Sequence, residues 1–269
     1  MIQVGLEAPR VFMLGGGDYK SLPDSMFLCR ELVKDSSGLN YNLKFVDRKR
    51  MRFARHGHSC CAVANRYIVV SGSRKEVNAA AQRVEIYDVE INDWMELSKI
   101  NEGRHYHSSC NINDQFIYIF GGIQNQNKKY SSSIERMQFS MQNFTHPWER
   151  IVLNEVPSIN QSITARQGAG MCQLASNQIM IVGGFNGKFL SDYYIITLDE
   201  STGKPVGLNK QENEKQMMQG STLFPFQVPT IGDTAQRQAY TVDWQNMSLF
   251  FFNGDKWTYK QHVKHQANF

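Results

Sequence analysis

The sequence lacks the features that would place the protein in a membrane or on the secretory route. No apolar run approaches the roughly 20 residues that a membrane-spanning helix needs. Residues 1–10 contain no basic region followed by an apolar one, so we expect neither a secretory signal nor a transit peptide. We therefore expect no membrane partner.

An excess of one charge is also missing. The formal net charge is +4 over 269 residues, of which 20% are charged. This excess is far below the basic footprint of a nucleic-acid-binding protein, so nucleic acid is not an expected partner. The charge is compatible with a protein partner whose surface or peptide is acidic.

Cysteine is present, but not in the pattern of a disulfide framework. There are five cysteines, which is an odd number, and no CxxC pair. We expect reduced thiols. Together with the missing signal, the thiols favour a cytoplasmic location, with association with the cytoskeleton as a further expectation.

The motifs of common enzymes are missing as well. The sequence contains no nucleophile elbow, phosphate-binding loop or HExxH motif. No carboxylate pair is recognisable, although spacing along the chain would not reveal a pair assembled from distant segments. We therefore predict no catalytic residues, no metal site and no cofactor.

What the sequence does contain is an internal repeat. Four segments start at an arginine and reach an aligned glycine after the same interval of 17 residues: Arg55–Gly72, Arg104–Gly121, Arg166–Gly183 and Arg237–Gly254. A further copy begins inside its unit and places Gly15 at the glycine position. Self-similarity at a period of roughly 20–50 residues is the signature of a repeat architecture.

Each copy has the pattern of a four-stranded unit. A short strand leads through an Asn, Asp or Ser turn to an apolar strand such as YIVV, FIYIF, IMIV or LFFF. A third strand follows (VEIYDV, SIERMQF or DYYIITL), and in two copies a fourth strand carries Trp94 or Trp148. Four strands in about 50 residues predict one blade of a β-propeller.

The repeat resembles the kelch-repeat β-propellers. The resemblance rests on the RHGHS and RHYHS starts, the aromatic strands that end in Gly-Gly, and the Tyr and Trp of YDVEINDW. It implies a single all-β domain, a kelch-type propeller of about five four-stranded blades that is incomplete at its termini. The expected blades are 1–53, 54–102, 103–164, 165–210 and 237–269, with an irregular insertion at 211–236. The fourth copy departs from the pattern, because GKPVGL stands where the Trp-bearing strand would be.

Histidine and cysteine recur at the repeat period. Equivalent positions are shared by Cys61, Cys110 and Cys172, by His56 and His105, and by His58 and His107. Packing is the first explanation, since cysteine behaves as a small apolar residue where strands are crowded. A metal site is the alternative, because alternate residues of a strand share a face and two His-x-His pairs could converge.

The repeated arginines are the candidate partner-binding residues: Arg55, Arg104, Arg166 and Arg237. Each precedes the innermost strand of its blade, so a closed propeller would gather them near one mouth of the central channel. A guanidinium group suits carboxylates, and the resemblance implies a face that binds acidic peptides. The alternative is structural: each arginine bonds loop carbonyls and a neighbouring blade.

A second basic patch lies in DRKRMRFAR and comprises Arg48, Lys49, Arg50 and Arg52. It is expected to form the solvated outer strand and exit loop of the first blade, since charged edges discourage aggregation. The alternative is contact with an acidic protein surface, such as that of a cytoskeletal polymer.

These expectations combine into a non-catalytic subunit for protein–protein interaction or scaffolding in a larger assembly. It would bind through the propeller face and edges, and a partner chain could donate a strand to the short last blade. Two alternatives stay open. One is a stand-alone receptor for an acidic peptide, and the other is a small-molecule enzyme with its site at the channel mouth.

Overall fold

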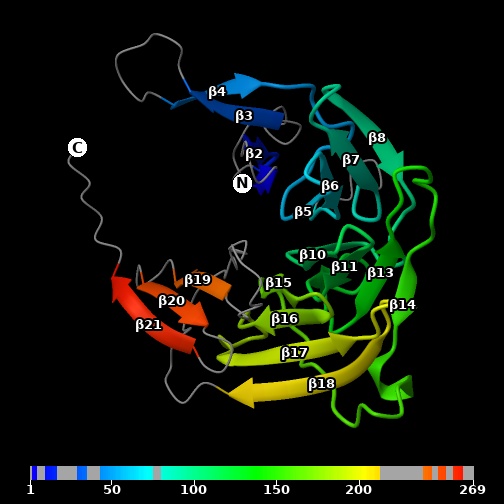
Figure 1. Cartoon of the computed structure of the whole chain (residues 1–269), viewed down its shortest axis with the longest axis vertical. Coiled ribbons are helices and arrows are strands. Elements are labelled where there is room, and N and C mark those ends of the chain that lie inside the picture. The colour runs from blue at the N-terminus through cyan, green and yellow to red at the C-terminus, as the bar shows by residue number, and fades with distance from the viewer. Residues whose placement is uncertain are drawn as a thin grey trace.

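The computed structural model describes residues 2–4, 10–16, 29–34, 43–74, 80–212, 239–243, 248–252 and 257–262. Within these ranges the chain forms four four-stranded antiparallel sheets and one three-stranded sheet. The sheets fan out around a common centre (Figure 1). This arrangement confirms the predicted all-β propeller of about five blades.

The strands follow one another from the centre outward in each sheet. The first sheet contains β1 (Ile2–Val4), β2 (Arg10–Leu14), β3 (Cys29–Lys34) and β4 (Leu43–Asp47). The second contains β5 (Ser59–Val63), β6 (Tyr67–Ser71), β7 (Val84–Asp88) and β8 (Asp93–Leu97). The third contains β10 (Ser108–Ile112), β11 (Phe116–Phe120), β13 (Ile134–Gln138) and β14 (Glu149–Ile151). A short pair, β9 (Arg104–His105) with β12 (Ile123–Gln124), accompanies this sheet.

The fourth sheet contains β15 (Gly170–Ala175), β16 (Gln178–Val182), β17 (Asp192–Leu198) and β18 (Pro205–Glu212). The fifth contains β19 (Ala239–Asp243), β20 (Ser248–Phe252) and β21 (Trp257–His262). A 3₁₀ turn, η3 (Leu153–Glu155), lies in the connection between the third and fourth sheets.

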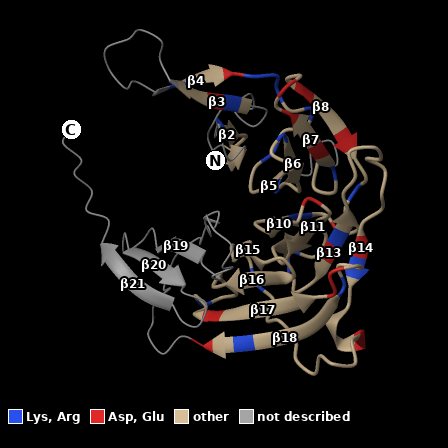
Figure 2. Cartoon of the chain, viewed as in Figure 1, with Lys and Arg blue, Asp and Glu red and all other residues tan. Residues whose placement is uncertain are grey.

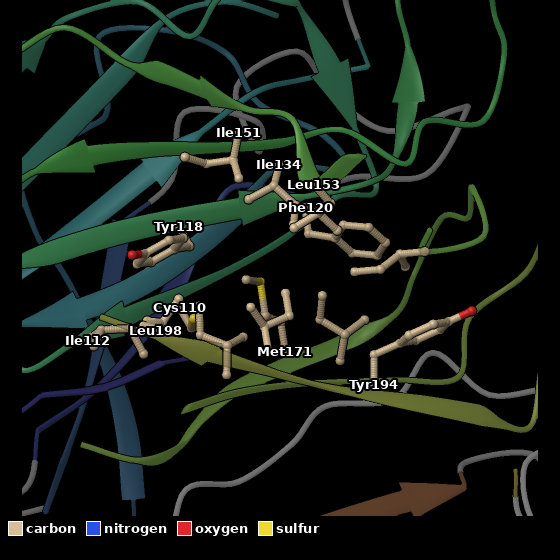
Figure 3. Close-up of a cluster of buried hydrophobic side chains, with 14 of the residues drawn as sticks. Cys110, Ile112, Tyr118, Phe120, Ile134, Ile151, Leu153, Met171, Tyr194 and Leu198 are labelled. Atoms are coloured by element: carbon tan, nitrogen blue, oxygen red, sulfur yellow. The ribbon is translucent and has the colours of Figure 1, made fainter. Parts of the chain in front are cut away.

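In the second, third and fourth sheets the second strand (β6, β11 and β16) is buried at every residue because both of its faces are covered. In β11, Phe116, Tyr118 and Phe120 pack toward the fourth sheet. The alternate residues Ile117 and Ile119 pack toward the second sheet. Side chains of a strand point to opposite faces in turn, so one strand contributes to two separate cores. Figure 3 shows the core between the third and fourth sheets, where Tyr118 and Phe120 face Met171 and Tyr194.

The two tryptophans of the repeat anchor the connections between blades. Trp94 lies in β8, as predicted, and donates a hydrogen bond from Nε1 to the carbonyl oxygen of Lys49 (2.7 Å). Trp148 lies immediately before β14 and donates to the carbonyl oxygen of Ser98 (2.9 Å). Each tryptophan therefore fixes the segment that enters its own blade.

The first and last sheets stand at the two ends of the arc in Figure 1. Among the described strands, no pairing joins these two sheets. Residues Gln211 and Glu212 of the expected insertion belong to β18, and the remainder of 211–236 lies outside the described residues. The predicted donation of a strand by a partner chain stays a prediction.

Charged residues gather away from the centre of the propeller. In Figure 2 the inner strands β5, β10, β15 and β16 are free of charge, whereas β8, β14 and β18 carry it. In the part of the chain that the structure describes, no helix is long and apolar enough to cross a membrane.

Candidate interaction surface

The described arginines of the repeat are completely buried: Arg55, Arg104 and Arg166 are each 0% exposed. Each donates a hydrogen bond from Nη1 to the carbonyl oxygen of the glycine 17 residues later. The pairs are Arg55 with Gly72 (2.9 Å), Arg104 with Gly121 (3.0 Å) and Arg166 with Gly183 (2.9 Å). The constant interval in the sequence is the span of this bond, from the entry of a blade to the end of its second strand.

Each arginine also pairs with a carboxylate near the start of the third strand. The contacts are Arg55 Nε–Glu85 Oε2 (2.9 Å), Arg104 Nη2–Glu135 Oε1 (2.6 Å) and Arg166 Nη1–Asp192 Oδ1 (2.6 Å). Burial lowers the pKa of the Arg55 and Arg104 side chains, and the paired carboxylates oppose it. Burial tends to raise the pKa of Asp192, but the hydrogen bonds and charge of Arg166 bring it below its ordinary value.

The backbone of each arginine links its blade to the preceding one. The amide after the repeat glycine donates to the arginine carbonyl of the next blade: Gly16 to Arg55 (3.1 Å), Ser73 to Arg104 (3.1 Å) and Gly122 to Arg166 (2.8 Å). The approach is so close that a Cβ at Gly72 would lie 2.4 Å from the Arg104 carbonyl oxygen. Glycine is required there by contact between blades as well as by its φ of +71°.

These contacts correct the assignment of the repeated arginines to partner binding. The guanidinium groups of Arg55, Arg104 and Arg166 lie inside the fold, where carboxylates and carbonyls accept hydrogen bonds from all of their described donors except Arg55 Nη2. A fully buried guanidinium group cannot touch a partner, so the geometry supports the structural alternative. Arg237 lies outside the described residues.

The second basic patch is also held largely by contacts within the fold. Arg48 Nη2 lies 2.5 Å from Glu31 Oε2, and Lys49 Nζ lies 2.6 Å from Asp93 Oδ1. Arg52 donates from Nη2 to the carbonyl oxygen of Trp94 (2.5 Å). The patch therefore ties the first blade to the second, although Lys49, Arg50 and Arg52 remain exposed. Their contact with an acidic surface stays a prediction.

Most of the recurring histidines and cysteines are buried, namely His105, His107, Cys61, Cys110 and Cys172, whereas His56 and His58 are partly exposed. His107 is 5% exposed and its Nε2 lies 2.8 Å from Ser71 Oγ. Burial holds the pKa of His107 well below its ordinary value and lowers that of His58 to about 3, so both rings are neutral. Burial also raises the pKa of the Cys172 thiol to about 12. Within the described residues, no three His, Cys, Asp or Glu side chains gather as metal ligands would.

The two ends of the propeller differ in charge. Strand pairing brings the start of each first strand beside the end of the second, as in Ser108 opposite Phe120. Five segments without acidic residues therefore share one end, and we call them the loop face: 54–58, 103–107, 121–133, 164–169 and 183–191. Glu102 and Glu155 lie in the same connections, outside these segments. The other end, the turn end, comprises 64–66, 89–92, 113–115, 139–148, 176–177 and 199–204. The acidic residues of the turn end are Glu90, Asp114, Asp199 and Glu200, against the basic residues Arg66 and Lys204.

Exposed lysines and aromatic rings stand together on the loop face. The rings of Tyr130 and Phe185 have centroids 6.2 Å apart, and those of Phe185 and Phe189 are 5.0 Å apart. Phe189 is 47% exposed. The lysines Lys128, Lys129 and Lys188 are exposed in the same two connections. We call the three rings of Tyr130, Phe185 and Phe189 the aromatic ledge.

A hollow of about 360 Å³ borders the aromatic ledge at Tyr130. Its lining includes the hydroxyl-bearing residues Ser132 and Ser162, the amide of Asn154 and the guanidinium group of Arg150. The side chain of Arg150 is 58% exposed, and its Nη1 lies 3.5 Å from Glu102 Oε1. The hollow therefore offers polar donors and acceptors beside an apolar surface, as protein-binding sites commonly do.

One residue of the loop face departs from the repeat. Gly57 and Gly168 occupy equivalent positions with φ of +66° and +60°, and Tyr106 occupies the third with φ of +53°. The left-handed conformation costs a residue with a Cβ roughly 1–2 kcal/mol. Tyr106 therefore adopts a backbone conformation that glycine would adopt without this cost.

Reasoning from the sequence missed the aromatic ledge, the lysines and Tyr106. A signal for Tyr106 was present, since RHGH, RHYH and RQGA align and only the middle one lacks glycine. The ledge left no comparable signal, because its rings come from connections that are more than 50 residues apart in the chain.

Four-stranded sheets around a common centre, three of them with a buried arginine that bonds the end of the second strand, define a β-propeller. The chain belongs to the kelch-repeat proteins, since the family described as the KLHDC2/KLHL20/DRC7 Kelch-repeats domain matches residues 10–228. Kelch-repeat domains typically mediate protein–protein interactions and are generally not enzymes.

Two known proteins are similar in sequence to part of this chain. Alpha-scruin of Limulus polyphemus is 26% identical over 191 residues, which are 68% of this chain and 19% of that protein. The F-box/kelch-repeat protein SKIP20 of Arabidopsis thaliana is 28% identical over 100 residues, 36% of this chain and 23% of that protein. The chain matches about a fifth of the length of each relative.

Proposed function

We propose that this chain is a non-catalytic protein-interaction subunit that binds an acidic segment of a partner protein on its loop face. The observation that carries the proposal is the unequal charge of the two ends. The five segments of the loop face contain no acidic residue, and the acids nearest to them in the same connections are Glu102 and Glu155. The turn end carries four acidic residues against two basic ones. Complementary charge speeds encounter and excludes partners of the wrong sign.

The aromatic ledge would supply the affinity that charge alone does not. Exposed charge pairs contribute little, with a median of about 0–1 kcal/mol each. Buried aromatic anchors dominate the binding energy of most interfaces. The exposed ring of Phe189 and its neighbours would accept an apolar residue of the partner, with the three lysines contacting the flanking carboxylates.

The experiment requires the natural companion, which gentle purification and mass determination of co-eluting proteins would supply. Binding of that companion is then measured for a triple variant, Lys128→Glu, Lys129→Glu and Lys188→Glu. The matched control is Lys204→Glu, an exposed lysine at the turn end. We expect the triple variant to bind at least about tenfold more weakly, in line with charge repulsion across an interface, and the control to bind normally. Equal loss in both variants would refute the assignment to the loop face.

Two further features of the proposal concern context. All five cysteines are free thiols in the structure, which supports a reducing location such as the cytoplasm. Association with the cytoskeleton, membership of a larger assembly and strand donation by a partner remain predictions. A stand-alone receptor for an acidic peptide would use the same surface, and a monomer that binds such peptides without a stable companion would favour it.

A further inference from the structure

Backbone hydrogen bonds join three equivalent positions of three blades on the loop face, and we call this chain of hydrogen bonds the relay. The amide of Tyr106 donates to the carbonyl oxygen of Gly57 (2.7 Å), and the amide of Gly168 donates to the carbonyl oxygen of Tyr106 (2.8 Å). All three residues have positive φ. The relay therefore fixes one backbone conformation at each position, whatever side chain is present.

The requirement for positive φ favours glycine, which two of the three blades use. A bulky residue with positive φ is a genuine outlier, and such outliers cluster at sites of function. The relay needs only the backbone of Tyr106. Something other than the relay must account for the phenol ring.

The ring lies on the surface among basic and aromatic groups. It packs over Gly57, where an added Cβ would come within 2.8 Å of Tyr106 Cε1. The imidazole rings of His56 and His105 have centroids 6.0 and 5.0 Å away. Arg74 Nη1 lies 3.4 Å from the phenol oxygen. The ring remains partly exposed.

The relay also connects Tyr106 to the aromatic ledge. Gln167, next to Gly168, exchanges two backbone hydrogen bonds of 2.9 Å with Phe185. The loop face thus runs from Tyr106 to Phe185. Arg74 borders it at Tyr106 from the connection 72–83, which is not one of the five segments and contains Glu76 in its sequence. An extended segment could cross all three blades along this path.

We infer that Tyr106 is a binding hot spot, the aromatic anchor over which an extended acidic segment of a partner protein lies. This inference rests on the proposed function of the loop face and assigns its central contact. Tyrosine combines a large rigid apolar area with a hydroxyl group, which explains its enrichment among hot spots. The segment would place an apolar residue against the ring and carboxylates near Arg74 and the lysines.

The test uses a random peptide display library as the probe, so it does not depend on the natural companion. Wild-type protein should enrich peptides rich in Asp and Glu that also contain an apolar residue. The affinity of one enriched peptide is then measured for Tyr106→Gly, Tyr106→Asn and Tyr106→Phe, together with the melting temperature of each variant. Asn65→Gly is the control, because Asn65 is an exposed residue with positive φ at the turn end.

We expect Tyr106→Gly to bind at least about tenfold more weakly, the usual size of a hot-spot effect, with a melting temperature equal to or above that of the wild type. Tyr106→Asn, which tolerates positive φ, should behave alike. Tyr106→Phe should keep most of the affinity because it keeps the ring, and Asn65→Gly should bind normally.

Two results would overturn the inference alone: unchanged affinity in Tyr106→Gly, or a clear fall in melting temperature in both Tyr106→Gly and Tyr106→Asn. The second would make the ring a packing residue. If wild-type protein enriches no acidic peptide, the proposed function of the loop face fails together with the inference.

Discussion

Replacing Arg104 with alanine separates the structural role of the repeated arginines from a role in binding. The substitution leaves Glu135, which is 1% exposed, without the guanidinium group 2.6 Å from its Oε1. The main-chain amide and side-chain amide of Asn101 still donate to Glu135 Oε2, at 2.7 and 2.8 Å. The carbonyl oxygen of Gly121 loses the donor that lies 3.0 Å away.

The size of the effect follows from the burial of the pair. Removing one partner of a buried ion pair costs roughly 3–5 kcal/mol, because the other charge stays buried without compensation. A typical domain has a total stability of only about 5–15 kcal/mol. We therefore expect Arg104→Ala to lose a large fraction of the free energy of unfolding. Adding Glu135→Gln should restore part of it, since glutamine removes the uncompensated charge and still accepts from Asn101.

Urea denaturation, followed by the intrinsic fluorescence of the tryptophans, measures these changes. The matched control is Arg150→Ala, which breaks a pair at 3.5 Å whose side chains are 58% and 31% exposed. Solvent screening limits that loss to below about 1 kcal/mol. The reasoning would be refuted if Arg104→Ala were no less stable than Arg150→Ala, and weaker binding of a partner by a fully stable Arg104→Ala would restore the binding role.

Three further outcomes are expected. Because the pKa of His107 is depressed in the folded state, the unfolded chain takes up the proton first, so stability is complete above the ordinary pKa of about 6.5 and falls below it. The loss per histidine is at most about 1.4 kcal/mol per pH unit, and urea midpoints that stay level from pH about 6.5 to 5 would contradict it. Gly72→Ala should lower the melting temperature much more than Gly187→Ala. Both glycines have positive φ, but only a Cβ at Gly72 would clash with a neighbouring blade, at 2.4 Å from the Arg104 carbonyl oxygen. Equal losses of melting temperature would show that this close approach is unimportant. Burial raises the pKa of Cys110 and Cys172, so a thiol reagent should label them only after unfolding, and rapid labelling of the folded protein at neutral pH would refute their placement.

Much of the fold could be predicted from the sequence because a propeller repeats one solution. The 17-residue interval from Arg104 to Gly121 reflects a single hydrogen bond that recurs in other blades. The apolar strand around Tyr118 was recognisable because strands covered on both faces lose the alternation of polar residues. Neither inference needed a contact between distant segments.

The role of the arginines could not be predicted, because burial depends on partners elsewhere in the chain. Glu135 follows Arg104 by 31 residues, and only the third strand brings them together. An acidic residue stands near the start of three successive third strands, as Glu85, Glu135 and Asp192. That pattern becomes informative only when the arginine is known to reach it.

The candidate surface was hidden for a related reason. Lys129 and Lys188 lie in connections of different blades, and nothing in their local sequence says that both connections reach the same end. That conclusion requires the strand register, in which Ser108 lies opposite Phe120 and Gly170 lies opposite Val182. The charge of an end of the molecule is a property of the assembled sheets.

The most direct test of the central claim is amide hydrogen exchange of the chain, alone and bound to the companion that co-purifies with it. The loop face should account for the protection, with slower exchange at 103–107, 121–133 and 183–191 in the complex. Protection confined to the turn end, at 89–92, 113–115 and 199–204, would contradict the claim and move the binding surface to the acidic end of the propeller.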